Sequence, residues 1–304
     1  MSKKLRRFVF GLIVVSLAAA GPCAAQSETD RGLIGHWEFH EAAGDAVRDS
    51  SGNRNDGRIV PSKTPEQTWG KGPFARSASF SGDNDHFVQV PASDSINSLK
   101  TRITVVALIY PRTLWTPADK VRRKWDEGVT WVANRFGDTT YNKRQRVPNL
   151  TGYIAVVQRQ WRETMHPDLF FLGYGPRKDG LRYKWHLGLK GSEPSIYALP
   201  KGQDKPRAGE WVQLAGVYDG DTGKMSMYVD GELIGTETHV GQMRLDPQSL
   251  TRPLAIGAEL NGPRTDDPSG EFDGYVRDVR IYNRALSDDE VRALARQYLG
   301  PARK

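Results

Sequence analysis

An Asp-Gly dipeptide between two alternating apolar runs constrains the fold of this chain more than any other feature. Asp230-Gly231 separates residues 225–229 from residues 232–234. A type I′ turn needs positive φ at both central residues, and Asp-Gly supplies it, so this pattern predicts a β-hairpin. A third strand, residues 211–218, precedes the hairpin, and the three segments predict an antiparallel meander. Three residues of that strand are expected to help fill the interior of a sandwich: Trp211, Leu214 and Val217.

Similar strand patterns, bounded by turn residues, recur along most of the chain. Residues 33–39 alternate, which places Trp37 and Phe39 on one face and His36 on the opposite, polar face. Residues 104–110 form an apolar run rich in β-branched side chains. Short strands at this spacing predict an all-β sandwich or barrel.

One helix is predicted, near the C-terminus. Ser287 and Glu290 form a capping box, in which each side chain satisfies a free backbone N–H at the start of the helix. Val291, Leu294 and Ala295 follow at helical spacing, and a Gly-Pro dipeptide ends the pattern.

The N-terminal segment has the pattern of a signal peptide. Four basic residues precede an apolar or small-residue run over residues 8–20. That run has 13 residues, whereas a membrane span needs roughly 20. We therefore predict a signal peptide over residues 1–25 and a mature domain over residues 26–304. The protein is expected to be exported (periplasmic, cell-surface or extracellular) and not to span a membrane.

Cys23 is the only cysteine, and it permits a second interpretation of the N-terminus. In that interpretation Cys23 is acylated and tethers the protein to a membrane by a lipid. Pro22 stands where lipoprotein signals have a small residue, so ordinary cleavage after Ala25 is favoured and the lipid tether is the alternative. In either case the folded part has no thiol pair to form a disulfide.

The charge balance does not indicate nucleic acid as a partner. The chain carries 43 Lys/Arg and 36 Asp/Glu, a net +7, and the signal peptide contains four of these basic residues and no acidic one. The mature balance is therefore 39 against 36, or +3. So small an excess gives no reason to expect a polyanionic nucleic acid, and none is predicted.

Six motifs follow one another in a recognisable order. They are residues 35–39, 49–57, 79–88, 211–215, 228–231 with 256–257, and 274–287. This series resembles the laminin-G-like, concanavalin A-like lectin/glucanase superfamily. The resemblance implies an all-β jelly roll, a sandwich of two antiparallel sheets, with one short C-terminal helix. It also implies glycan binding, often in secreted proteins and often with calcium.

The resemblance further implies two calcium sites, each built from turn carboxylates. Asp49 and Asp278 match a structural site that clamps the first and last strands in some relatives. Glu259 and Asn261 match the ligand-binding calcium site of pentraxin-like relatives. Ordinary turn formation, which selects the same residue types, is the alternative at both places.

Residues 112–186 combine basic and aromatic side chains. They hold 15 Lys/Arg and seven Asp/Glu, a local balance of +8, and the part from about 112 to 174 is longer than the family's usual link, so we expect an insertion. Aromatic faces stack on sugar rings and Arg pairs with sulfate or carboxylate, so an anionic polysaccharide is the predicted partner. The candidate ligand-binding residues are Trp125, Arg144, Arg146 and Trp161. The alternative is that half of these aromatic residues are core and the basic ones form a solvated rim.

The sequence favours binding over catalysis. It lacks the Glu-x-Asp-x-x-Glu run of the family's β-glucan hydrolases, a Gly-x-Ser-x-Gly elbow and a His-Glu-x-x-His pair. Scattered residues can still converge in a fold, so a glycoside hydrolase or polysaccharide lyase on the same fold remains an alternative, as does a cell-surface protein-interaction domain. The prediction is a secreted, non-catalytic, lectin-like carbohydrate-binding domain, with calcium as a candidate cofactor.

Overall fold

The computed structural model describes residues 30–60, 69–81, 86–114, 153–160, 168–260, 268–269 and 271–300. Residues 32–304 form one compact unit, separate from residues 1–31, and the description below concerns that unit. The predicted signal peptide, with Cys23, lies outside the described residues. In the described parts, no helix is long and apolar enough to cross a membrane.

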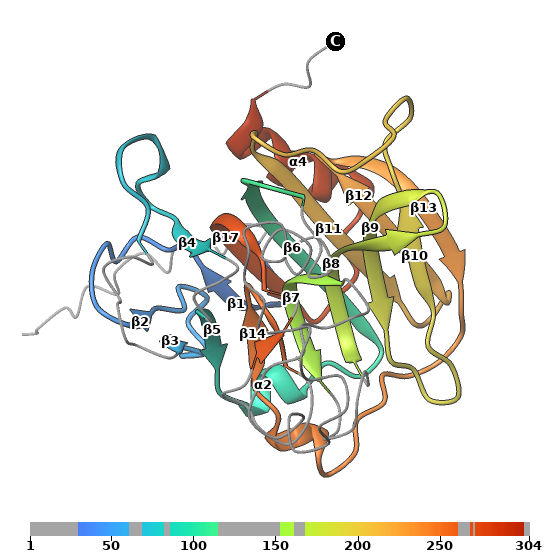
Figure 1. Cartoon of the computed structure of the whole chain (residues 1–304). Coiled ribbons are helices and arrows are strands. Elements are labelled where there is room, and N and C mark those ends of the chain that lie inside the picture. The colour runs from blue at the N-terminus through green and yellow to red at the C-terminus, as the bar shows by residue number, and fades with distance from the viewer. Residues whose placement is uncertain are drawn as a thin grey trace, which may run out of the picture. The chain divides into compact units, whose positions relative to one another are not determined.

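Two antiparallel sheets make up the unit (Figure 1). The first sheet has the order β1-β17-β6-β11-β12-β13, with β4 also paired to β17. Its strands are β1 (Leu33–Trp37), β4 (Ala78–Ser81), β6 (Arg102–Pro111), β11 (Val212–Asp219), β12 (Lys224–Val229), β13 (Glu232–Thr238) and β17 (Asp273–Tyr282).

The second sheet has the order β10-β9-β8-β7-β14-β5-β3-β2. Its strands are β2 (Ala46–Val47), β3 (Gly57–Val60), β5 (Phe87–Val90), β7 (Ile154–Gln160), β8 (Asp168–Arg177), β9 (Gly180–Leu187), β10 (Ser195–Ala198) and β14 (Leu254–Ile256). The smaller elements are a β15 (Glu259–Leu260) and β16 (Pro268–Ser269) pair, helices α2 (Asp94–Asn97) and α4 (Asp288–Leu299), and 3-10 turns η2 (Gly72–Phe74) and η4 (Ser249–Thr251). The predicted jelly-roll sandwich with one C-terminal helix is confirmed.

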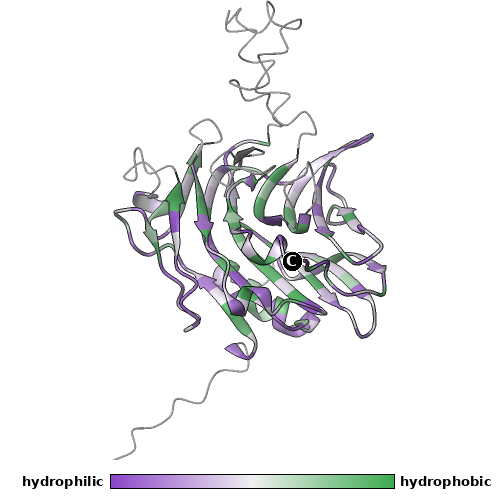
Figure 2. Cartoon of the chain, turned by 90° about the horizontal axis from the view of Figure 1, so that it is seen from below, coloured by the Kyte–Doolittle hydropathy of each residue, from purple (hydrophilic) through white to green (hydrophobic). Residues whose placement is uncertain are grey.

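The main core lies between the two sheets, because alternate residues of each strand point inward. Apolar stretches along the strands and polar residues in the turns are visible in Figure 2. Trp185 of β9 is fully buried there. A Cβ on Gly216 of β11 would lie 2.3 Å from the Trp185 ring, so a glycine at this position makes room for the indole.

A second, smaller core lies under helix α4, on the outward face of the first sheet. Val291 and Leu294 of the helix share it with Val217 and Tyr282 of the strands. The predicted capping box is present, since the Ser287 hydroxyl accepts the backbone N–H of the third helical residue and that residue's carboxylate accepts from Ser287. The helix is therefore held both by its cap and by its apolar face.

The predicted meander is formed by β11, β12 and β13. Asp230 and Gly231 have φ angles of 52° and 78°, as a type I′ turn requires. A Cβ on Gly231 would lie 2.9 Å from the Cα of Arg292 in α4, so this turn also approaches the helix closely.

The expectation for Trp211, Leu214 and Val217 holds for Leu214 alone. Leu214 lies in the core between the sheets, whereas Val217 lies under α4 and Trp211 is only half-buried. The reason is the two-residue repeat of a strand: positions 211 and 217 differ from position 214 by odd numbers, so they face outward.

The expected insertion from about 112 to 174 contains two strands of the second sheet. β7 and the first part of β8 lie in the middle of that sheet, and Val156, Phe170 and Leu172 are buried between the sheets. Residues 115–152 and 161–167 of the expected insertion lie outside the described residues.

Candidate functional site

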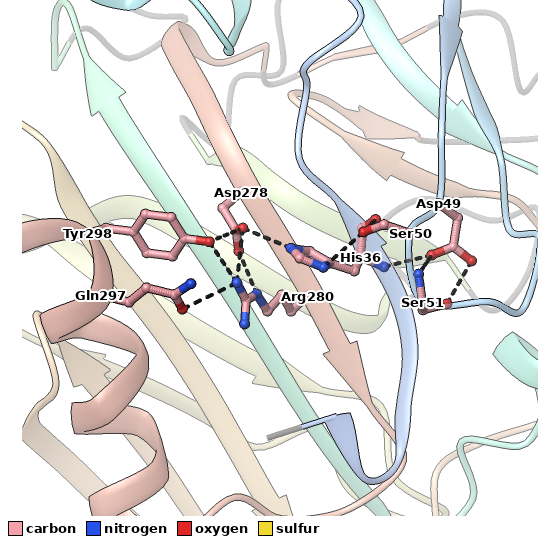
Figure 3. A network of polar contacts seen from close by, with 8 residues as sticks. All are labelled: His36, Asp49, Ser50, Ser51, Asp278, Arg280, Gln297 and Tyr298. Atoms are coloured by element: carbon pink, nitrogen blue, oxygen red, sulfur yellow. Dashed lines mark hydrogen bonds and ion pairs between the residues drawn. The ribbon is translucent and has the colours of Figure 1, made fainter. Parts of the chain in front are cut away.

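His36 of β1 lies between two carboxylates that were predicted to share a calcium ion (Figure 3). Its backbone N–H donates to Asp49 Oδ1 over 2.9 Å, and its ring Nε2 lies 2.9 Å from Asp278 Oδ2. Ring Nδ1 lies 3.0 Å from the Ser50 hydroxyl. The fold therefore does bring Asp49 and Asp278 to one place, on either side of a single residue.

Asp49 accepts hydrogen bonds from its own turn. The backbone N–H groups of Ser51 and Asn55 donate to it over 2.9 Å each, and the Ser51 hydroxyl donates over 2.8 Å. The Asp49 side chain thereby fixes the turn and ties it to β1.

Asp278 is buried and surrounded by donors on the outward face of the first sheet. Arg280 Nε donates to it over 2.9 Å, and the Tyr298 hydroxyl of α4 donates to the same carboxylate (Figure 3). Burial by itself raises the pKa of Asp278, but the His36 hydrogen bond and the Arg280 charge outweigh it and the pKa is lowered. The ionised carboxylate thus joins β1, β17 and α4.

Glu259 lies in a different part of the fold, in the β15–β16 hairpin, and is almost fully buried. Its predicted partner Asn261 lies outside the described residues. Within the described ranges, no three His, Cys, Asp or Glu residues gather closely enough to hold a metal ion. Calcium at either place stays a prediction.

The outward face of the second sheet carries a group of aromatic and basic side chains. We call Tyr153, Phe171, Arg177, Lys184 and Tyr197 the lysine–aromatic cluster. Register brings them together, because Lys184 of β9 pairs with Tyr197 of β10 on one side and with residue 173 of β8 on the other. Residue 173 is a glycine, and a Cβ there would lie 2.1 Å from the Ile154 carbonyl oxygen and 3.1 Å from the Phe171 ring, so a side chain would displace that ring or the neighbouring strand.

Three aromatic rings surround the Lys184 ammonium. Its Nζ lies 3.8 Å from the centroid of the Tyr153 ring, 4.5 Å from that of Phe171 and 5.7 Å from that of Tyr197. Lys184 is 6% exposed. No acidic partner for this ammonium is found among the described residues, so aromatic faces compensate its charge in part.

A second cation, Arg177, contacts the Tyr197 ring. The Arg177 guanidinium, which is exposed, sits 4.5 Å from the centroid of the Tyr197 ring. The Tyr197 hydroxyl donates to the Tyr153 hydroxyl over 3.0 Å, and burial raises the pKa of Tyr197. Both tyrosines are half-buried. Tyr153, Tyr197 and Arg177 therefore reach the surface in one region, whereas Phe171 and Lys184 are buried.

Polar groups flank the cluster. His186 Nδ1 lies 2.8 Å from the Ser195 hydroxyl. Burial, helped by the Lys184 charge, lowers the pKa of His186 to about 3, so the imidazole is uncharged at neutral pH. The Gln158 side chain donates to Asp168 over 2.5 Å, and the Asp168 charge contributes to the raised pKa of Tyr197.

Comparison with known proteins supports the resemblance noted in the sequence. Residues 146–292 match the family model described as the concanavalin A-like lectin/glucanases superfamily. The matched range runs from before β7 to α4 and includes strands of both sheets. The chain carries a concanavalin A-like domain.

Two curated relatives of this concanavalin A-like domain are pentraxins. The mouse pentraxin-related protein PTX3 is 33% identical over 88 residues, which are 28% of this chain and 23% of the relative. The human PTX3 is 23% identical over 157 residues, which are 48% of this chain and 39% of the relative. The matched stretches thus cover less than half of either pentraxin.

Three solved structures share the fold of the concanavalin A-like domain. The binding domain of Paraclostridial Mosquitocidal Protein 1 has a TM-score of 0.57 at 14% identity over 89% of this chain and 53% of that one. Domain 4 of an extracellular GH43 arabinanase from Geobacillus stearothermophilus was solved in complex with arabinotriose. It has a TM-score of 0.52 at 18% identity over 86% of this chain and 98% of that one. The third is a structure of botulinum neurotoxin type C, a toxin whose cell entry depends on interaction with two ganglioside molecules. It has a TM-score of 0.53 at 14% identity over 90% of this chain and 53% of that one.

The four predicted ligand residues, Trp125, Arg144, Arg146 and Trp161, lie outside the described residues of the concanavalin A-like domain. Of the aromatic residues in the same region that the structure describes, four are core, namely Phe170, Tyr174, Tyr183 and Trp185. The other two, Tyr153 and Phe171, belong to the lysine–aromatic cluster.

Sequence analysis did not single out Lys184, although a signal for it was present. Residues 182–186 alternate basic and aromatic side chains, and Tyr183 and Trp185 are buried in the core. The two-residue repeat therefore places Arg182, Lys184 and His186 together on the outward face.

Proposed function

We propose that this protein is an exported, non-catalytic, lectin-like domain that binds an acidic polysaccharide at the lysine–aromatic cluster. The observation that carries the proposal is Lys184, a residue that is 6% exposed and whose ammonium is surrounded by three aromatic rings. An ammonium in such a place has lost most of its water, and a sugar carboxylate or sulfate supplies the opposite charge that no described residue provides.

The aromatic rings suit the rest of the ligand. Tyr153 and Tyr197 are half-buried and joined through their hydroxyl groups, so they offer fixed faces and edges to a sugar ring. Exposed Arg177 can pair with an acidic group in two parallel hydrogen bonds. Shape selection then comes from the tyrosines and charge selection from Arg177 and Lys184.

Proteins of the same fold support a carbohydrate ligand. The arabinanase domain was solved with arabinotriose, and the neurotoxin interacts with gangliosides. Export is proposed from the N-terminal sequence pattern, and calcium assistance from the carboxylates at Asp49, Asp278 and Glu259.

A panel of matched polysaccharides tests the proposal. The purified protein would be titrated with polygalacturonate, hyaluronate and heparin, and with methyl-esterified polygalacturonate as an uncharged control of the same sugar. We expect binding to at least one acidic polymer, weaker binding to the ester, and a clear loss of affinity between low salt and roughly 0.5 M salt, where exposed charges are screened.

Tyr197→Ala separates a site at the cluster from diffuse attraction. It removes a ring that contacts both cations but changes no charge, so affinity for the acidic polymer should fall about tenfold. The proposal fails if the protein binds none of the three acidic polymers, or if the esterified and acidic forms bind equally well.

A further inference from the structure

A second group of aromatic side chains lies on the outward face of the other sheet. We call Phe74, Tyr110, Trp211 and Tyr275 the aromatic platform. Tyr110 of β6 and Tyr275 of β17 are paired across the first sheet. Helix α4 covers this face at the end of β17 that carries Tyr282. The platform lies at the other end of β17, which the helix does not cover.

The four rings pack on one another and remain half-exposed. Phe74 stacks on Tyr275 with 4.1 Å between centroids, and Tyr110 meets Trp211 edge-on at 5.6 Å. Trp211 also meets Phe74 with an angle of 47° between the ring planes, so neither of these two ring contacts is a parallel stack. The face of the indole thus has no stacking partner within the described part of the chain.

The polar tips of the platform have no partner in the part of the chain that the structure describes. Among the described residues, none hydrogen-bonds the Tyr110 hydroxyl, the Tyr275 hydroxyl or the Trp211 indole N–H. By contrast, the Trp37 indole donates to the Asn55 carbonyl over 2.8 Å. Three open donors beside a half-exposed indole face therefore mark a surface that is suited to a polar ligand with an apolar side.

The platform carries no unpaired charge. Arg112 lies 4.9 Å from the centroid of the Tyr275 ring, but its Nε is paired with Asp273 at 3.1 Å. A second contact of Arg112 goes to the Phe80 carbonyl. The guanidinium is thus neutralised and held in place, unlike the ammonium of Lys184.

The exposed apolar residues of the described chain lie elsewhere. The large ones are Leu233, Val240 and Leu250, on other elements. Interfaces with other proteins are also rich in aromatic residues, but a stable one takes in about 20–30 residues on each side. An isolated aromatic surface with free hydroxyl and indole groups fits a sugar ring better.

We propose that the aromatic platform is a second carbohydrate site, which binds an uncharged sugar ring. The C–H face of the ring would lie on Trp211, and its hydroxyl groups would exchange hydrogen bonds with Tyr110, Tyr275 and the indole. This site is independent of the lysine–aromatic cluster, because it belongs to the other sheet and has no charge to offer.

Titration with neutral tetrasaccharides of glucose, galactose, mannose, xylose and arabinose tests the second site. We expect at least one to bind with an affinity insensitive to salt, and to change the fluorescence of Trp211. Trp211→Ala should weaken that binding about tenfold, and Tyr275→Phe should weaken it severalfold by removing one hydroxyl. If Trp211→Ala does not fold, Trp211→Phe replaces it in the test. This variant keeps most of the apolar area and should still weaken binding of the tetrasaccharide, because it lacks the indole N–H.

Two controls separate this inference from the proposed function. Leu233→Ala removes an exposed apolar side chain on the same sheet and should change nothing. Lys184→Met should weaken acidic polymers and leave the neutral tetrasaccharide unaffected. If no neutral tetrasaccharide binds while acidic polymers do, the second site is wrong and the proposed function stands. If Trp211→Ala instead alters the oligomeric state, the platform is a protein interface and the proposal is overturned.

Discussion

Two buried charged side chains are stabilised in contrasting ways. Asp278 has Arg280, His36 and Tyr298 as partners, and its pKa is lowered despite burial. Lys184 has aromatic rings around it, and no carboxylate of the described ranges pairs with it. A fully paired charge serves the structure, whereas a desolvated charge compensated only by ring faces is poised to bind an anion.

Removal of the Asp278 charge should destabilise the fold strongly. Asp278→Asn leaves the buried Arg280 guanidinium without its counter-ion, which typically costs about 3–5 kcal/mol. Urea unfolding of the variant measures the loss. The matched control is Asp289→Asn in α4, where the side chain is 91% exposed and the change should be small. Equal free energies of unfolding for the two variants would contradict the assigned role of Asp278.

The buried His186 predicts a dependence of stability on pH. Its pKa in the folded protein is lowered from 6.5 to about 3, so between these values the unfolded chain binds the additional proton. The stability contribution of the neutral imidazole is complete above pH 6.5 and is lost as the pH falls toward 3. His186→Gln cannot titrate, so its melting temperature should fall less across this window. Parallel curves for wild type and variant would show that His186 does not carry the effect.

At the scale of elements, α4 depends on its cap as well as on its apolar face. The backbone N–H of Ser287 donates to Glu290 over 2.8 Å, and the Ser287 hydroxyl accepts from the backbone of Glu290 over 3.3 Å. Ser287→Ala should lower the free energy of unfolding by about 1 kcal/mol. Chemical denaturation measures this change, and a variant as stable as wild type would mean that the apolar face alone fixes the helix.

Elements with local signals could be predicted from the sequence. The turn at Asp230-Gly231 needs positive φ, and the start of α4 needs a cap, so a few adjacent residues define each. β7 and β8 were missed as sheet strands, because residues 154–157 and 169–172 are continuous apolar runs in strands that are covered on both faces. The pattern of such runs does not distinguish a strand from other buried segments.

The candidate site could be predicted only in part, since it depends on pairing between distant strands. Asp49 and Asp278 were expected to meet, and they do so through His36. The cluster around Lys184 requires the registers of β8, β9 and β10, which place Gly173 and Tyr197 beside the lysine. Register is a property of the assembled sheet, and a single sequence does not state which strands become neighbours.

At the scale of the whole molecule, the sandwich gives each sheet one outward face. The second sheet presents a cationic aromatic cluster, and the first presents an aromatic platform with its arginine paired. The two outward faces point away from each other, so we expect each site to bind its own glycan segment.

Calcium has a testable consequence for the whole domain. An ion that binds only the folded state adds stability by mass action, roughly 2.7 kcal/mol at a hundredfold excess over its dissociation constant. If the carboxylates at Asp49, Asp278 or Glu259 hold calcium, the melting temperature should rise when calcium replaces a chelator. Identical melting curves in calcium and in chelator would remove calcium from the account.

The central claim is that Lys184 binds the acidic group of a polysaccharide, and calorimetric titration of paired lysine variants tests it most directly. Polygalacturonate, hyaluronate and heparin would each be titrated into wild type, Lys184→Met and Lys224→Met. Lys224 is an exposed lysine of β12, so both variants lose one positive charge. The account predicts about tenfold weaker binding for Lys184→Met, with a reduced dependence on salt, and nearly unchanged binding for Lys224→Met. Equal affinities for the two variants, with both still folded, would contradict it.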